Sequence, residues 1–135
     1  MKFAFVLIIL LLAIMPLNAL GQDNVPTIEI LEPADGERTG TSTNLVVTAT
    51  GYDLRNADFS ITERGSNVAT GSALDCSYMH NTGTGLTYMK CDQEINLKSF
   101  AGKNVILTAS VEERNSGRIK DSVELYVSEK CVQGH

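Results

Sequence analysis

The sequence contains no tryptophan, and tyrosine and phenylalanine together make up only 6% of the chain. Antibody-type domains bury a tryptophan in their core, so its absence argues against that class. Histidine is nearly as scarce, with His80 in a turn-rich segment and His135 at the last position. A Ser-His-Asp mechanism needs a histidine that a carboxylate holds against a hydroxyl, and neither position suits one. We therefore expect no catalytic residues and no enzyme activity.

The sequence also lacks the spacing of a metal site. Zinc needs three or four converging nitrogen or sulfur ligands, whereas Cys131 and His135 offer only two near the C-terminus. Calcium accepts carboxylates, but Asp35 with Glu37 and Asp53 with Asp58 lack the dense spacing of a dedicated calcium loop. We expect no metal and no other cofactor.

Basic residues are outnumbered and dispersed, with 11 Lys and Arg against 16 Asp and Glu and a net charge of −5. Nucleic acids bind concentrated positive surfaces that displace the counterions of the phosphates. Anionic lipid also attracts clustered basic residues. The sequence therefore predicts no nucleic-acid partner and no docking on a lipid surface.

Charge is absent altogether from residues 3–17, an apolar run that follows Lys2. The run is shorter than the roughly 20 residues that a membrane-spanning helix needs. Small residues, Ala19 and Gly21, stand before a cleavage point at the end of the segment. This three-part pattern predicts a secretory signal peptide over residues 1–21. The mature protein is then secreted, at the cell surface or in the periplasm, without membrane insertion.

Cysteine is limited to three residues, which in an exported chain favours disulfide chemistry. Cys76 and Cys91 lie at equal distances from a turn-rich tetrapeptide, residues 82–85, so that folding there places them opposite each other. Their bond closes a loop of about 15 residues and contributes roughly 3 kcal/mol. Cys131 remains as a free thiol or as the link of an intermolecular dimer. Spacing alone also leaves open a bond between Cys131 and either of the other two cysteines.

Strand-sized segments with alternating apolar residues account for most of the mature chain, and none has helical spacing. Turn residues separate them, as in the Pro33–Gly36 and Arg64–Asn67 stretches. This pattern predicts an all-β fold, a single β-sandwich of about seven antiparallel strands over residues 22–128, followed by a C-terminal tail over 129–135. The expected strands cover residues 27–31, 44–50, 57–61, 68–73, 86–91, 95–97, 105–111 and 123–127.

The stretch Pro26–Gly36, followed by Leu45–Gly51, resembles the start of bacterial and archaeal Ig-like surface domains. In those domains a first strand leads to a Pro-x-Asp/Asn-Gly turn and then to a second strand rich in valine and threonine. Residues 95–127 also fit the family, with an Ala-Gly turn and a final hairpin. The resemblance covers nearly the whole mature chain and implies an Ig-like sandwich at the cell surface or in the periplasm. The Cys76–Cys91 hairpin departs from the family pattern.

This hairpin is the expected contact surface, because a disulfide at its base braces a loop on a rigid scaffold. Tyr78 and Tyr88 are expected as diagonal neighbours on one face, where aromatic rings favour a sugar. The glycines at the tip are expected to be replaceable with thermal stability nearly intact. The residues expected to contact a partner are Tyr78, His80, Asn81, Thr82, Gly83, Thr84, Gly85 and Tyr88.

The sequence thus predicts a secreted, non-enzymatic Ig-like module for adhesion, surface association or protein binding. Its expected partner is a protein or a surface glycan. The alternative is a small secreted carbohydrate-binding or inhibitory protein that uses the same hairpin.

Overall fold

The computed structural model describes residues 26–129. The expected signal peptide, the Cys131 thiol and His135 therefore lie outside the described residues.

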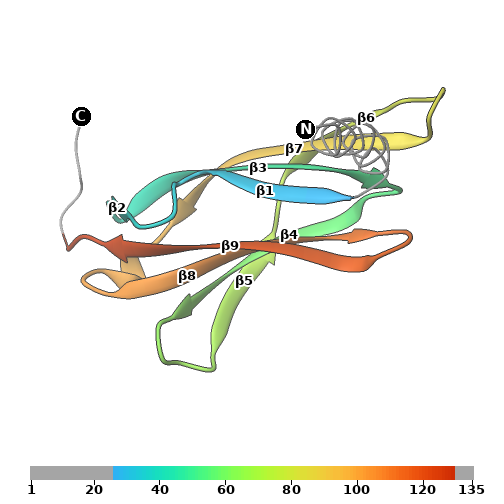
Figure 1. Ribbon diagram of the computed structural model, residues 1–135. Coiled ribbons are helices and arrows are strands. Elements are labelled where there is room, and N and C mark those ends of the chain that lie inside the picture. Colours follow the sequence, from blue (N-terminus) through green and yellow to red (C-terminus); the bar gives the residue numbers. More distant parts are fainter. Residues whose placement is uncertain (1–25, 130–135) are drawn as a thin grey trace, which may run out of the picture.

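The described chain forms two β-sheets packed face to face (Figure 1). The first sheet has the strand order β1-β3-β7-β6, with β1 at Thr27–Glu32, β3 at Ser42–Tyr52, β7 at Leu86–Asn96 and β6 at Cys76–His80. The second has the order β2-β9-β8-β4-β5, with β2 at Glu37–Thr39, β9 at Gly117–Val127, β8 at Asn104–Glu113, β4 at Arg55–Glu63 and β5 at Ala69–Ala73. This arrangement confirms the predicted all-β sandwich.

Among the strands of the described residues, β2 runs parallel to its neighbour β9 and the other pairings are antiparallel. A 3₁₀ turn, η2 at Lys98–Phe100, follows β7 and leads toward β8. Within residues 26–129 there is no helix long and apolar enough to span a membrane.

The core lies between the sheets and follows the alternation of the sequence. Leu45, Val47 and Ala49 on β3 are buried against residues from β4 and β8, and Leu107 on β8 is fully buried. Side chains at every second position of a strand share one face, so alternating apolar residues supply one inner surface for each sheet. This buried surface is the main source of the sandwich's stability.

Residues 26–129 form nine strands where about seven were expected. β2 follows the expected Pro33–Gly36 turn and was not among the expected segments, and β6 was expected only as the first arm of the cysteine hairpin. Conversely, the two expected strands at 86–91 and 95–97 form one continuous strand, β7. Asp92 and Glu94 interrupt the apolar pattern there, but both side chains are exposed on the outer face and need no burial. Between them, Gln93 accepts a hydrogen bond from the Asp75 N–H at 2.8 Å.

Candidate binding surface

The hairpin of β6 and β7 extends beyond the body of the sandwich, at the upper right of Figure 1. Its register places Cys76 opposite Cys91 and His80 opposite Thr87, as expected. The two cysteines form a disulfide. Because Cys91 is fully buried while Cys76 is only partly buried, this bond ties the outermost strand of the first sheet to the core.

The hairpin tip is organised by Asn81. Its side-chain oxygen accepts hydrogen bonds from the N–H groups of Gly83 at 2.9 Å and Thr84 at 3.2 Å. Its backbone N–H donates to the Leu86 carbonyl, and its own carbonyl accepts from Gly85, both at 2.8 Å. Asn81 therefore shapes the turn. Thr82 and Thr84 are exposed at the tip, where they are available for contact.

The two tip glycines differ, which revises the expectation that both can be replaced at little cost. Gly85 has a φ of +81°, a left-handed conformation that disfavours side chains, whereas no positive φ occurs at Gly83. We predict that Gly85→Ala lowers the free energy of unfolding by about 1 kcal/mol. Gly83→Ala, whose new Cβ would lie 3.3 Å from the Asn81 side-chain oxygen, should cost less. Chemical denaturation of both variants checks this, and equal losses would contradict it.

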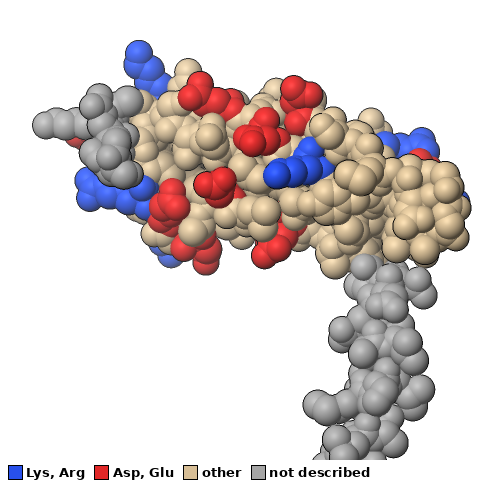
Figure 2. Space-filling model, turned by 90° about the horizontal axis from the view of Figure 1, so that it is seen from above, with Lys and Arg blue, Asp and Glu red and all other residues tan. Residues whose placement is uncertain are grey.

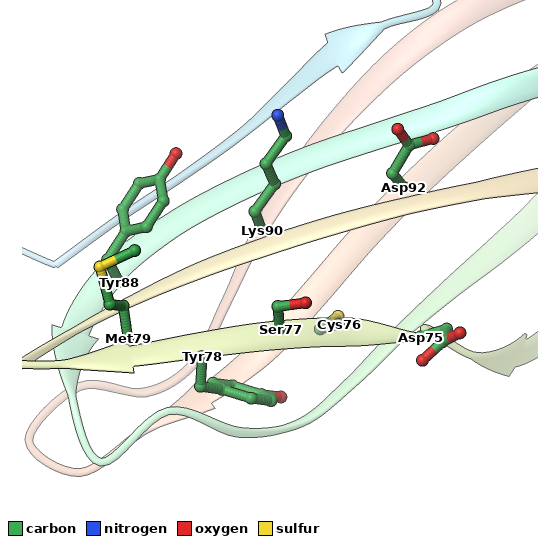
Figure 3. Close-up of a pocket in the computed structure, with 8 residues that line it drawn as sticks. All are labelled: Asp75, Cys76, Ser77, Tyr78, Met79, Tyr88, Lys90 and Asp92. Carbon is green, nitrogen blue, oxygen red and sulfur yellow. The ribbon is translucent and has the colours of Figure 1, made fainter.

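The expectation that Tyr78 and Tyr88 share one face is wrong. Tyr78 faces Met89 and Tyr88 faces Met79. Residues that face each other across an antiparallel pair point to the same side, and adjacent residues point to opposite sides. Tyr78 therefore lies on the inner face and Tyr88 on the outer face, and Figure 3 shows them on opposite sides of β6. The expected two-tyrosine platform for a sugar is not formed by this pair.

Met79 takes the place that Tyr78 was expected to occupy beside Tyr88. Met79 is 70% exposed and Tyr88 is 41% exposed, and they stand together on the outer face (Figure 3). The sequence interpretation missed Met79, although counting the register from the cysteine pair would have placed it. An open groove of about 350 Å³ follows the hairpin here, lined by Asp75, Cys76, Ser77, Tyr78, Met79, Tyr88, Lys90 and Asp92.

The outer part of the hairpin, residues 77–89, carries no formal charge, and the first charged side chain on β7 is Lys90, which faces Ser77. Residues 77–89 contain no Asp, Glu, Lys or Arg, and His80 is the one titratable side chain apart from the tyrosines. His80 Nδ1 lies 3.3 Å from the Thr87 hydroxyl. Figure 2 shows acidic side chains over the middle and far end of the first sheet, away from the hairpin. We call residues 77–89 the uncharged hairpin.

A cluster of charged residues lies near the β8–β9 turn, and its members form hydrogen bonds and ion pairs with other groups of the protein. The Arg118 guanidinium donates to the Asn56 carbonyl at 3.2 Å and to the Ser110 hydroxyl at 2.8 Å. It also pairs with Asp58 at 3.3 Å and Glu112 at 3.2 Å. These contacts hold β4 against β8 and β9, so the cluster is structural.

Glu113 is the buried carboxylate beside this cluster, with a side chain only 3% exposed. It accepts hydrogen bonds from the backbone N–H groups of Tyr52 at 2.8 Å, Asn115 at 2.7 Å and Ser116 at 2.8 Å. Burial raises the pKa of Glu113, but the bonds from Tyr52, Asn115 and Ser116 outweigh it and leave the pKa below its ordinary value. Sequence interpretation gave this residue no role.

The acids considered as calcium ligands have other partners. Asp35 accepts the Glu124 N–H at 2.8 Å, and Asp58 accepts the Ser110 hydroxyl at 2.6 Å. Across residues 26–129, no three His, Cys, Asp or Glu side chains gather closely enough to hold a metal ion.

The sequence matches no protein-family model and no curated protein.

Proposed function

We propose that this protein is a secreted, non-enzymatic Ig-like module that binds a protein partner through its uncharged hairpin. The observation that carries the proposal is the hairpin itself, which exposes Met79 and Tyr88 and is braced by a disulfide. Interface centres are depleted of charge and enriched in aromatic residues and methionine. Residues 77–89 have this composition, and Tyr78, Met79 and Tyr88 are exposed within them.

The strand order supports the Ig-like assignment. An Ig domain of the constant type pairs strands A, B, E and D in one sheet and C, F and G in the other. Lettered along the chain, β1, β3, β7 and β6 correspond to A, B, E and D, while β4, β8 and β9 correspond to C, F and G. β2 and β5 then extend the second sheet at its two edges. The signal-peptide pattern of residues 1–21 supports a location outside the cytoplasm.

Binding to intact cells tests the proposal. Labelled mature protein is added to cells of the organism that produces it, with Met79→Lys compared against Ser99→Lys. Both variants add one positive charge, and Ser99 is an exposed residue of η2, outside the hairpin. We expect Met79→Lys to weaken binding at least tenfold, because it places a charge at the centre of the contact, and Ser99→Lys to bind like the wild type.

Two other results would count against the proposal. Equal binding by both variants would show that the hairpin makes no contact. Binding that survives protease treatment of the cells but is lost with glycosidase would identify a glycan partner in place of a protein.

A further inference from the structure

The outer edge of β6 has unpaired backbone groups. β6 is the last strand of its sheet, and no other strand of residues 26–129 pairs with that edge. The Asn81 N–H donates to the Leu86 carbonyl across the hairpin, so this facing pair is hydrogen-bonded. Hydrogen-bonded and non-bonded pairs alternate in an antiparallel ladder. The N–H and C=O groups of Cys76, Tyr78 and His80 therefore point away from β7, toward the open edge.

This edge lacks the devices that normally prevent strand pairing. Natural edges carry charged side chains, prolines or bulges. β1, the opposite edge of the same sheet, has Glu29 and Glu32, a register shift near its end and Pro33 directly after it. β6 has no Lys, Arg, Asp or Glu, no proline and no register shift.

The remaining uncharged edge, β5, offers much less to a partner. Its residues are Ala, Thr, Gly and Ser, all exposed, so its side chains have little apolar area to bury. β6 instead presents Tyr78, 47% exposed, and Met79, 70% exposed.

We infer that β6 pairs antiparallel with β6 of a second copy of this chain, with Tyr78 on the two-fold axis; the inference deepens the proposed function and rests on it. Tyr78 would face Tyr78 of the second copy, and Cys76 would face His80 of the second copy. These three facing pairs use every outward N–H and C=O of both strands, each pair exchanging two hydrogen bonds.

The two-fold axis also brings compatible side chains of the two β6 strands together on each face of the joined sheet. Facing residues share a sheet face, so the two Tyr78 rings form a cross-strand aromatic pair on the inner face. On the outer face Met79 lies opposite Ser77 of the second copy, so that Tyr88 and Met79 of one copy continue into Ser77 and Lys90 of the other. No charged side chain of β6 enters the interface from either copy.

The open edge is also limited to the length of β6 itself. The N–H of Asp75, just before the strand, already donates to Gln93, and Asn81, just after it, is engaged in the turn. A longer foreign strand would run past Asp75 toward the acidic part of the sheet. A second β6 is a strand of matching length without charge.

Charge selects the antiparallel orientation. Asp75, Asp92 and Glu94 lie at or beyond the Cys76 end of the hairpin. An antiparallel pair places these acids at opposite ends of the joined sheet, whereas a parallel pair would bring them side by side. Three acidic side chains against one lysine, Lys90, would then meet the same set from the second copy, so the parallel arrangement would be repulsive.

The dimer is tested by sedimentation equilibrium of the mature protein between roughly 1 µM and 1 mM, in a Cys131→Ser background that removes any link through that thiol. A five-residue edge buries less than the roughly 800 Å² per partner of a standard interface, so we expect a Kd of about 10 µM to 1 mM. Tyr78→Pro removes an outward N–H without breaking a β6–β7 hydrogen bond and should give a monomer. Met79→Lys should also give a monomer. Because this variant contains no new proline, its result does not depend on how proline affects the folding of β6. Ser99→Lys should dimerise like the parent.

Disulfide trapping tests the register. Facing residues in a hydrogen-bonded pair have Cα atoms about 5.5 Å apart, within the range that a disulfide spans. Tyr78→Cys should therefore give a covalent dimer on mild oxidation, and Ser72→Cys on β5 should not. Peptide mapping should show the new bond between the two copies of position 78, with Cys76–Cys91 retained.

A protein that is monomeric at 1 mM, or a dimer that persists in both Tyr78→Pro and Met79→Lys, would overturn the inference. A monomer whose cell binding still depends on Met79 would overturn the dimer and leave the proposed function standing. A dimer lost in Met79→Lys, with cell binding unchanged, would overturn the proposed function alone.

Discussion

Glu113→Ala is expected to lower the free energy of unfolding by about 2–4 kcal/mol. The substitution removes the acceptor for three backbone N–H groups, those of Tyr52, Asn115 and Ser116. The three hydrogen bonds are partly buried and end on an ionised carboxylate, so water replaces them only in part when the side chain is removed. Two of these donors shape the β8–β9 turn, and the third belongs to β3, so the loss affects both sheets.

The site around Glu113 is built to hold the carboxylate. A Cβ added at Gly51 would lie 2.6 Å from Glu113 Cγ, so the glycine leaves the space that the acid occupies. Glu113→Gln keeps the side-chain size and one acceptor oxygen and should cost roughly half as much as Glu113→Ala. Chemical denaturation measures both losses.

Glu112→Ala is the matched control, because it removes the same charged group one residue away. Glu112 is 44% exposed and pairs with Arg118 at the surface, so its loss should cost under about 1 kcal/mol. If Glu113→Ala costs no more than Glu112→Ala, water replaces the carboxylate and Glu113 does not lock the turn.

The same carboxylate predicts an acid sensitivity with a defined sign. The pKa of Glu113 is lower in the folded state than its ordinary value of 4.5. The unfolded chain therefore takes up this proton first as the pH falls. The stability from Glu113 is complete above about pH 4.5 and is lost as the pH falls through the folded-state value. The difference in stability between wild type and Glu113→Gln should shrink over that range, and a difference independent of pH would contradict the assignment.

Local patterns in the sequence predicted the sandwich and the register of the hairpin. Alternation placed Leu45, Val47 and Ala49 in the core, because an inner face needs apolar residues at every second position. The turn midway between Cys76 and Cys91 favoured their pairing, and the structure selects it over the bonds to Cys131 that spacing left open.

The contacts that the sequence did not predict depend on tertiary structure, or on whether a residue occupies an odd or an even position along its strand. Glu113 looks like a surface acid until the fold brings the Tyr52 N–H to it from 61 residues away. Met79 and Tyr78 are neighbours in sequence, and a shift of one residue exchanges the faces on which they lie. Asp92 and Glu94 made β7 look like two strands in the sequence. Both residues lie on the exposed face, where a charged side chain does not end a strand.

Replacing Cys76 and Cys91 together with alanine is expected to lower the free energy of unfolding by about 3 kcal/mol. The bond joins residues 15 apart, and removing it restores the conformational freedom of that loop in the unfolded chain. The loss should also be visible locally in the folded state, because β6 is a five-residue edge strand with one neighbour. Amide hydrogen exchange should accelerate over residues 76–80 more than in β3 or β8.

Reducing the Cys76–Cys91 bond in the Cys131→Ser protein removes the covalent link but keeps both cysteine side chains. The comparison with the double alanine variant therefore separates the effect of the bond from the effect of side-chain packing. The buried Cys91 side chain leaves a small void when truncated, so the double alanine variant should be somewhat less stable than the reduced protein. A stability loss under about 1 kcal/mol, with unchanged exchange in β6, would show that strand pairing alone holds the hairpin. If the loss is as large as expected, the bond presents β6 as a rigid edge before any partner arrives. β6 then loses less conformational entropy when a partner strand binds. Reduction of the disulfide should therefore weaken β6–β6 association together with the stability of the hairpin.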